Sequence, residues 1–218
     1  MQKPYRLVVF DWEGTLGDTL GHVLKALSVE SQRLNLGRFD ERVARQYVSL
    51  GLVKAIKKLF PNTTLLQQEQ LAEAVQYALS THSVDTYLFP DIKDMVQKLH
   101  QAGFDLAIAT NKGSQSLQRA LQETGLDAFF KVTRAAGQTA PKPCPQMLYE
   151  IMDVFGVTAS ETVMIGDSIA DIEMAIAAGV DAIGVDFYHQ QKTILLAAGA
   201  LIVFDDAIQL SHYFLDGL

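Results

Sequence analysis

The sequence predicts an α/β protein, in which a parallel β-sheet with helices on both faces is interrupted by an all-helical insertion. Short apolar runs alternate with helical segments through the second half of the 218-residue chain, and this alternation is typical of a parallel sheet that is buried on both faces. Residues 18–87 instead carry only helical periodicity. Because 49% of the residues are hydrophobic and 20% are charged, the chain can bury a sizeable core, which excludes a disordered protein.

The first predicted strand covers residues 5–10, an apolar stretch rich in β-formers that stops at Asp11. Within the insertion, apolar residues recur at helical spacing in three groups. The groups are Leu20, Val23, Leu24, Leu27 and Leu34, then Leu50, Val53, Ile56 and Phe60, and then Leu71, Val75, Ala78 and Leu79. Pro61 breaks this segment in the middle, and Phe89-Pro90 closes it.

Beyond Asp91 the pattern alternates between strands and helices. The predicted strands are residues 106–109, 130–133, 162–165, 182–185 and 201–204, and the predicted helices between them lie near residues 95–99, 114–124, 147–155, 170–178 and 193–198. Glycines follow several of these helices and mark their ends. We therefore predict an α/β core made of residues 1–17 and 88–218, with residues 18–87 as a separate helical domain.

Composition also limits the partners and the compartment. The formal net charge is −7, so the chain is not expected to bind nucleic acid. A single cysteine, Cys144, excludes an intramolecular disulfide framework and fits a reducing compartment. The longest apolar run, residues 194–204, is too short to span a bilayer, and the first residues do not resemble a signal peptide. We expect a soluble, cytoplasmic protein that does not bind membranes.

Polar residues follow the predicted strands at the edge where parallel sheets bind their ligands. Asp11 follows the first strand, Thr110 follows the second, and Asp167 follows another, with Asp171 one helical turn later and Lys142 in a loop. Carboxylates gathered in this way repel one another unless a cation joins them, and oxygen ligands suit Mg2+. The lysine would meet an anion as a compact point charge.

Four short motifs resemble, in order, those of the haloacid dehalogenase-like hydrolase superfamily. They are Asp-x-Glu-Gly-Thr at 11–15, Thr-Asn at 110–111, Lys-Pro at 142–143 and Gly-Asp-x-x-x-Asp at 166–171. The resemblance covers the whole chain and is greatest to the phosphoglycolate-phosphatase-type branch. It implies a Rossmann-like parallel sheet core with an inserted all-helical cap domain, because the helical insertion matches the cap of that superfamily.

The resemblance implies a role for each matching residue. Asp11 resembles the nucleophile that attacks phosphorus and becomes an aspartyl phosphate. Thr110 resembles the hydroxyl that holds the transferring phosphoryl group, with the Asn111 amide beside it as a second substrate contact. Lys142 resembles the residue that stabilises the negative charge on the nucleophile and on the phosphate.

The same resemblance implies a Mg2+ site. Asp167 resembles a direct ligand, alongside Asp11 and the backbone carbonyl of Glu13. Asp171 resembles the outer carboxylate that orients the lysine or a metal-bound water. Taken alone, a residue such as Asp171 would be a solvated residue in the first turn of a helix, so these roles rest on the four motifs together.

Glu13 departs from the pattern of the family, whose phosphatases carry aspartate there as the acid that protonates the leaving oxygen and later activates water. Glutamate has the same chemistry and one more methylene. It could therefore mean a slower phosphatase, a differently shaped site or a member that binds a phosphorylated ligand without turnover. A further alternative is a C–P hydrolase resembling the phosphonoacetaldehyde hydrolases, for which Trp12 at the site and Lys54 as a Schiff-base lysine are the supporting residues.

The helical insertion is expected to contact the substrate. Residues 50–56 resemble the cap loop by which such enzymes select substrates, and residues 38–58 carry a net charge of +4, which could attract an anion. The predicted substrate contacts there are Arg45, Gly51 and Lys54, with Trp12 at the edge of the site. An ordinary solvated helix face explains the same charges equally well.

Together these observations predict a Mg2+-dependent phosphatase that hydrolyses a small phosphorylated metabolite through an aspartyl-phosphate intermediate. Asp11, Glu13, Thr110 and Lys142 are the predicted catalytic residues. The identity of the substrate and the oligomeric state stay open.

Overall fold

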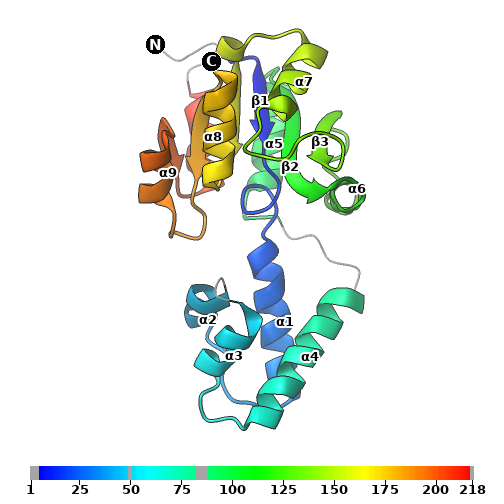
Figure 1. Ribbon diagram of the computed structural model, residues 1–218, viewed down its shortest axis with the longest axis vertical. Helices are drawn as coiled ribbons and strands as arrows, with labels where there is room; N and C mark the ends of the chain where they lie inside the picture. Colours follow the sequence, from blue (N-terminus) through cyan, green and yellow to red (C-terminus); the bar gives the residue numbers. More distant parts are fainter. Residues whose placement is uncertain (1–4, 49–50, 82–87, 217–218) are drawn as a thin grey trace. The chain divides into compact units, whose positions relative to one another are not determined.

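The computed structural model describes residues 5–48, 51–81 and 88–216. The chain divides into two compact units, of which one comprises Met1–Gly17 with Leu88–Leu218 and the other comprises Asp18–Tyr87 (Figure 1). The first unit contains the sheet, and the second has helices and no strand among its described residues.

The sheet of the first unit is parallel throughout, with the strand order β3-β2-β1-β4-β5-β6. Its strands are β1 (Leu7–Phe10), β2 (Asp105–Gly113), β3 (Val132–Ala136), β4 (Thr162–Gly166), β5 (Asp181–Val185) and β6 (Ile202–Phe204). After β1, the next two strands, β2 and β3, lie on one side of it, and the last three, β4, β5 and β6, lie on the other side. The topological switch point therefore lies at β1, and this is where such sheets bind their ligands. The predicted α/β class with a parallel sheet is confirmed.

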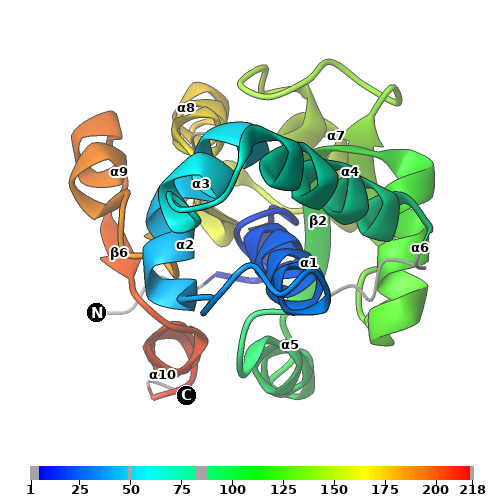
Figure 2. The same ribbon diagram turned by 90° about the horizontal axis from the view of Figure 1, so that it is seen from below.

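Helices cover both faces of this sheet, and successive residues of β1 point to opposite faces. Val8 and Phe10 pack in one core, whereas Leu7 and Val9 pack in the other. The first core is covered by α5 (Ile92–Gln101), α6 (Ser114–Thr124) and α10 (Ala207–Leu215), and the second by α7 (Gln146–Phe155), α8 (Ile169–Ala178) and α9 (Lys192–Ala198). Figure 2 shows α5 and α10 side by side. A short 3-10 helix, Ala159–Glu161, precedes β4.

The second unit consists of α1 (Thr19–Arg33), α2 (Glu41–Val48), α3 (Leu52–Leu59) and α4 (Leu65–Thr81). Asp18 caps α1, because its carboxylate accepts a hydrogen bond of 2.7 Å from the Gly21 backbone N–H. A separate small core holds the unit together, made of Leu27, Ile56, Phe60, Leu71 and Val75.

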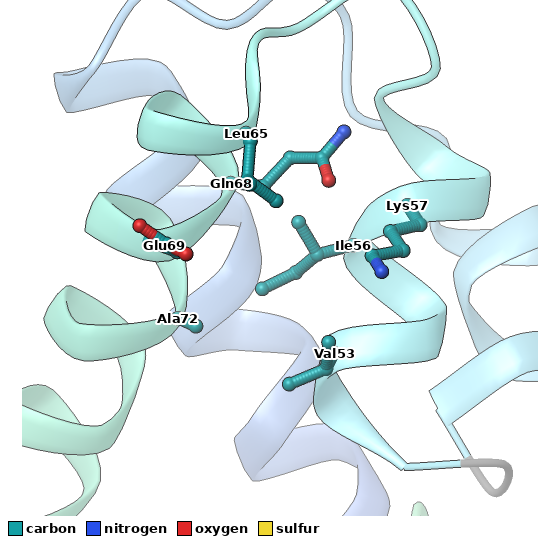
Figure 3. Close-up of a pocket in the computed structure, with 7 residues that line it drawn as sticks. All are labelled: Val53, Ile56, Lys57, Leu65, Gln68, Glu69 and Ala72. Carbon is teal, nitrogen blue, oxygen red and sulfur yellow. The ribbon is translucent and has the colours of Figure 1, made fainter.

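A pocket of about 180 Å³ opens between α3 and α4 of the helical unit (Figure 3). It is lined by Val53, Ile56 and Lys57 from α3 and by Leu65, Gln68, Glu69 and Ala72 from α4. The side chains around it are mostly apolar, with Lys57 on one helix and Glu69 on the other.

The predicted elements agree with the structure except at four places. Strand β2 continues to Gly113 and so includes Thr110 and Asn111, which were expected to follow it. The strand expected at 130–133 is β3 at Val132–Ala136, because Phe130 is buried in the core at the turn that follows α6. Helix α2 was not among the predicted groups, and neither was α10. The latter begins after Asp206, whose carboxylate accepts from the Gln209 N–H at 2.8 Å. Among the described residues, no helix combines the length and apolar character needed to cross a membrane.

Candidate active site

The site begins where β1 ends. The Asp11 backbone N–H donates to the Ile165 carbonyl of β4 at 2.9 Å, which continues the pairing of the two strands by one residue. Because β1 lies between β2 and β4, the first residue beyond it lies near the carboxyl ends of both neighbours. Asp11 is 6% exposed, so its carboxylate is removed from water and needs partners within the protein.

Lys142 supplies the positive charge at this point. Its Nζ lies 2.6 Å from Asp11 Oδ1 and 2.6 Å from Asp171 Oδ1, and all three side chains are buried. The contact with Asp171 is a hydrogen bond, whereas the contact with Asp11 is an ion pair without hydrogen-bond alignment. Asp11 Oδ1 thus has no hydrogen-bond partner among the described residues, and it is the buried side-chain oxygen that a ligand would satisfy.

Burial and like charges disturb the titration of these groups. Burial raises the pKa of Asp11 to about 6, against the opposing charge of Lys142 and together with the like charge of Asp171. The neighbouring Thr110 hydroxyl has the smaller opposite effect on this pKa. Burial alone would lower the pKa of Lys142, but the charges of Asp11 and Asp171 outweigh it and raise that pKa. The lysine therefore stays an ammonium in the site.

Asp167, the first residue after β4, is held against the loop that follows β1. Thr15 Oγ1 donates to Asp167 Oδ1 at 3.3 Å. Gly14 has a φ of +79°, and a Cβ there would lie 2.0 Å from Asp167 Oδ2, so both its backbone and its lack of a side chain are required. Burial, followed by the charges of Asp11 and Asp171, raises the pKa of Asp167 to about 7.

Asp171 links the lysine to the start of α8. Its Oδ2 accepts from the Ser168 N–H at 3.1 Å and from the Ser168 hydroxyl at 2.6 Å, within a capping box at the helix start. Its Oδ1 receives the hydrogen bond from Lys142. A Cβ on Gly166 would lie 2.3 Å from the Asp171 side chain, so the close approach of β4 to α8 depends on that glycine.

The predicted pair at the end of β2 has two different functions in the structure. Thr110 is buried and contacts Asp11. The Asn111 side chain instead holds the backbone of Lys142, since its Oδ1 accepts from the Lys142 N–H at 2.9 Å and its Nδ2 donates to the Lys142 carbonyl at 3.4 Å. Asn111 thereby fixes the loop that carries the lysine, and its predicted contact with the substrate stays a prediction.

Glu13 lies outside the aspartate cluster. Its Oε1 accepts a hydrogen bond of 2.8 Å from Lys112 Nζ, and the two side chains are 47% and 22% exposed. The carboxylate is accordingly accessible from solvent, as a group that exchanges protons with a substrate and with water must be.

Trp12, the residue directly after Asp11, packs in the core of the sheet unit. It is 2% exposed and lies in the same core as Phe10 and Leu16, and a Cβ on Gly17 would lie 2.7 Å from its indole nitrogen. Its ring is large and apolar, so its burial stabilises the fold. The predicted contact of Trp12 with the substrate stays a prediction.

The other predicted substrate contacts belong to the helical unit. Gly51 precedes α3 with a φ of +98°, and Lys54 is an exposed residue in the first turn of that helix. Arg45 is part of α2, but its side chain lies outside the described residues. The contribution of these three residues to substrate binding stays a prediction.

The aspartate cluster has the composition of a cation site. Asp11, Asp167 and Asp171 each offer a carboxylate oxygen, and these oxygens lie within 4.8 Å of one another. Two of the three have raised pKa values, and a buried oxygen of Asp11 has no hydrogen-bond partner within residues 5–48, 51–81 and 88–216. Because hard oxygen ligands of this kind suit Mg2+, the residues fit that ion.

Comparison with known proteins identifies the class. Residues 8–185 match the family model described as haloacid dehalogenase-like hydrolase. The chain belongs to this family, so the predicted resemblance is confirmed, as is the prediction of a hydrolase of the phosphatase type.

Individual relatives indicate the branch. The chain is 30% identical over 220 aligned residues to the phosphoglycolate phosphatase of Vibrio parahaemolyticus serotype O3:K6. The alignment covers 96% of this chain and 96% of the relative. It is also 30% identical to the phosphoglycolate phosphatase of Aliivibrio fischeri over 188 residues, or 82% of this chain and 83% of the relative. A predicted phosphoglycolate phosphatase from Haemophilus somnus has the same fold, with a TM-score of 0.65 and 21% identity over 96% of this chain and 98% of that one.

Sequence reasoning missed three residues that contact the predicted site residues. These are Thr15 on Asp167, Ser168 on Asp171 and Lys112 on Glu13. Thr15 and Ser168 stand within or beside the motifs and could have been singled out by position. Lys112 directly follows Thr-Asn, but nothing in the sequence indicates that a residue 99 positions away is its partner.

Proposed function

We propose that this chain is a Mg2+-dependent phosphatase that hydrolyses a small phosphomonoester, with phosphoglycolate as the first substrate to test. The observation that carries the proposal is the buried Lys142 ammonium between Asp11 and Asp171, with Asp167 beside them. A buried cation that is flanked by carboxylates at the open end of a sheet can neutralise a phosphoryl group while a carboxylate attacks it. The relatives named phosphoglycolate phosphatase support the choice of substrate class.

In the first step, an Asp11 carboxylate oxygen attacks phosphorus and the bond from phosphorus to the leaving oxygen breaks. Glu13 donates its proton to that oxygen, so the product leaves as an alcohol. Asp11 then carries the phosphoryl group, and Glu13 is a carboxylate. The side-chain oxygen of Asp11 without a hydrogen-bond partner supports its assignment as the nucleophile.

In the second step, water attacks phosphorus and Glu13 accepts its proton. The bond from phosphorus to Asp11 breaks, inorganic phosphate is released, and both carboxyl groups return to their starting states. Lys142 offsets the negative charge that develops on the phosphoryl oxygens, and Asp171 and Asn111 keep the lysine in place. The Thr110 hydroxyl, which lies beside Asp11, is proposed to hold the transferring phosphoryl group.

We assign the metal site to Asp11, Asp167 and the backbone carbonyl of Glu13, with Asp171 as the carboxylate that holds Lys142 rather than a direct ligand. When bound there, Mg2+ would neutralise charge on the phosphate and lower the repulsion between the aspartates. Thr15 would hold Asp167 in the orientation that the ion requires.

The helical unit, residues 18–87, is proposed to act as a cap that selects the substrate. Its support is the net charge of +4 in residues 38–58, since a basic surface attracts an anionic phosphomonoester. Arg45, Gly51 and Lys54 are the residues we propose for this contact. A cytoplasmic location remains an expectation from the sequence.

The test is steady-state hydrolysis of para-nitrophenyl phosphate with Mg2+, comparing the wild type, Asp11→Asn and Glu13→Asp. We expect turnover by the wild type, none by Asp11→Asn, and a retained or higher rate for Glu13→Asp, because the shorter acid matches the pattern of the family. Phosphoglycolate and a panel of phosphorylated metabolites then rank the substrates.

A different result would favour a different function. If the wild type turns over neither this ester nor the panel, while phosphate binds tightly and only with Mg2+, the chain is a phospho-ligand-binding protein. A substrate trapped on Lys54 by borohydride would instead indicate cleavage of a C–P bond.

A further inference from the structure

Glu13 and Lys112 form an ion pair between two neighbouring strand ends of the sheet unit. Glu13 belongs to the loop after β1, and Lys112 is near the end of β2. The 2.8 Å hydrogen bond uses Glu13 Oε1, whereas Glu13 Oε2 has no hydrogen-bond partner in the described part of the chain. One oxygen of the carboxylate is therefore anchored and the other remains available.

The backbone of β2 fixes the lysine end of this pair. The register between β2 and β3 shifts between Ala109 and Gly113, and such irregularities re-aim side chains next to active sites. The Lys112 backbone N–H also donates to Thr110 Oγ1 at 3.2 Å, which ties Lys112 to a residue that contacts Asp11. The backbone of Lys112 is therefore held in place, so that its side chain extends towards Glu13 from a fixed point.

A glutamate needs such an anchor more than an aspartate does. The additional methylene adds one rotatable bond, so an unanchored carboxylate would sample more positions and spend less time beside the leaving oxygen. Misplacing a catalytic group by about 1 Å can lower the rate on the order of a hundredfold. An ammonium that holds one carboxylate oxygen restricts this motion and leaves the second oxygen for proton exchange.

We infer that Lys112 is a positioning residue, which anchors Glu13 through Oε1 so that Oε2 can exchange a proton with the leaving group and with water. This inference rests on the proposed phosphatase function and on Glu13 as its acid and base. Lys112 acts on the reaction through Glu13 and does not itself need to contact the substrate.

The ion pair is not expected to hold the fold together. Both side chains retain solvent contact, and ion pairs of this kind contribute little to stability. Lys112→Met should therefore fold like the wild type, so that a kinetic effect can be separated from unfolding. Lys98→Met is the matched control, because Lys98 also pairs with a carboxylate, Asp94 Oδ2 at 2.7 Å, on the exposed surface of α5.

The experiment is a double-mutant cycle on kcat/KM for phenyl phosphate, which has a poor leaving group and so depends on proton donation. The proteins are the wild type, Lys112→Met, Glu13→Ala and the double variant, with Lys112→Arg as the conservative replacement. We expect Lys112→Met to lower kcat/KM about tenfold or more in the wild-type background. The same change should have less than about a threefold effect in the Glu13→Ala background, because the group that Lys112 positions is gone.

Lys112→Arg should recover most of the loss, since a guanidinium can also donate to Glu13, and Lys98→Met should match the wild type. The inference is overturned if Lys112→Met retains wild-type kcat/KM, or if its loss is as large without Glu13 as with it. A wild type that hydrolyses no phosphomonoester would overturn the proposed function, and the inference with it. The activity of the wild type therefore distinguishes the two failures.

Discussion

Two buried aspartates follow two strands of the same sheet, and they have opposite surroundings. Asp186, directly after β5, accepts backbone hydrogen bonds from Gln190 at 2.8 Å, Gln191 at 2.8 Å and Lys192 at 2.9 Å. Asp11, directly after β1, has an oxygen that pairs with the Lys142 ammonium but has no hydrogen-bond partner in the described part of the chain, and it lies beside other carboxylates. The residue type and the burial are the same at both positions.

The difference in hydrogen bonding distinguishes an aspartate that stabilises the fold from one whose carboxylate can bind a ligand or react. The carboxylate of Asp186 accepts hydrogen bonds from the turn that leads into α9, and these bonds stabilise that turn. The carboxylate of Asp11 is desolvated without full compensation, and its pKa rises to about 6. Incomplete satisfaction of a buried polar group is costly to the fold, and it is found where a ligand supplies the missing partner.

The largest expected effect on activity comes from Asp11→Asn. The amide has nearly the same shape but is no nucleophile, so we expect kcat for para-nitrophenyl phosphate to fall at least about a thousandfold. The free energy of unfolding, measured by urea denaturation at pH 8 without Mg2+, should not fall, because a disfavoured buried charge has been removed. A marked loss of stability would mean that Asp11 is as structural as Asp186.

Asp186→Asn is expected to show the reverse. Replacing one carboxylate oxygen by an NH2 group leaves at least one backbone N–H facing another donor, which costs about 1–3 kcal/mol. The urea midpoint should fall accordingly, while kcat per folded molecule stays within about twofold of the wild type. If Asp186→Asn abolishes turnover in fully folded protein, Asp186 belongs to the active site and the comparison fails.

Thr15→Val tests the orientation of Asp167. Removing the hydroxyl that donates to Asp167 Oδ1 should raise the Mg2+ concentration for half-maximal activity by about tenfold, the usual effect of losing a hydrogen bond that orients a metal ligand. The measurement is initial rate against Mg2+ concentration. Thr63→Val, which removes a hydroxyl that donates to the Phe60 carbonyl in the helical unit, should leave this value unchanged.

The smallest effect concerns pH. The folded-state pKa values of Asp11 and Asp167, about 6 and about 7, lie above the value near 4 expected in the unfolded chain. The stability that these two groups contribute is therefore present below about pH 4 and is lost as the pH rises through the folded-state values. Protons also compete with Mg2+ for the same oxygens.

Mg2+ should consequently raise the Tm by a few degrees more at pH 8 than at pH 5, as measured by differential scanning fluorimetry. Asp167→Asn removes one of the two groups and should reduce the difference between the two pH values. An equal stabilisation by Mg2+ at both pH values would show that the ion binds elsewhere.

Local patterns were enough to predict most of the secondary structure. Helix α6 begins and ends where its periodicity and the following glycine predict, at Ser114 and Thr124. The predicted start of β3 is two residues too early, because Phe130 has the apolar character of a strand residue but is buried at a turn. Helix α10 carried a detectable signal, with Asp206 as cap and Ala207, Leu210 and Phe214 at helical spacing.

The motifs predict which residues belong to the candidate site, but not which other residues these side chains contact. The amide of Asn111 holds the backbone of Lys142, which its motif did not indicate, and its expected contact with the phosphoryl group stays a prediction. Trp12 is buried in the core, and its expected contact with the substrate also stays a prediction. In each case the residue type is compatible with both positions, and the choice depends on neighbours that are remote in sequence.

The sequence by itself determined the order of strands and helices, the helical insertion and the positions of the charged residues, because these follow from local periodicity and from short motifs. Only the tertiary structure decided which charges meet. Strand order places β2 beside β1, which brings Lys112 to Glu13 across 99 residues of sequence. The loop after β3, held by Asn111 of β2, brings Lys142 to Asp11 across 131 residues. It also decided that Asp186 is satisfied by its own turn while Asp11 is not. Burial and hydrogen bonding depend on all the neighbours of a group, and most of those neighbours are distant along the chain.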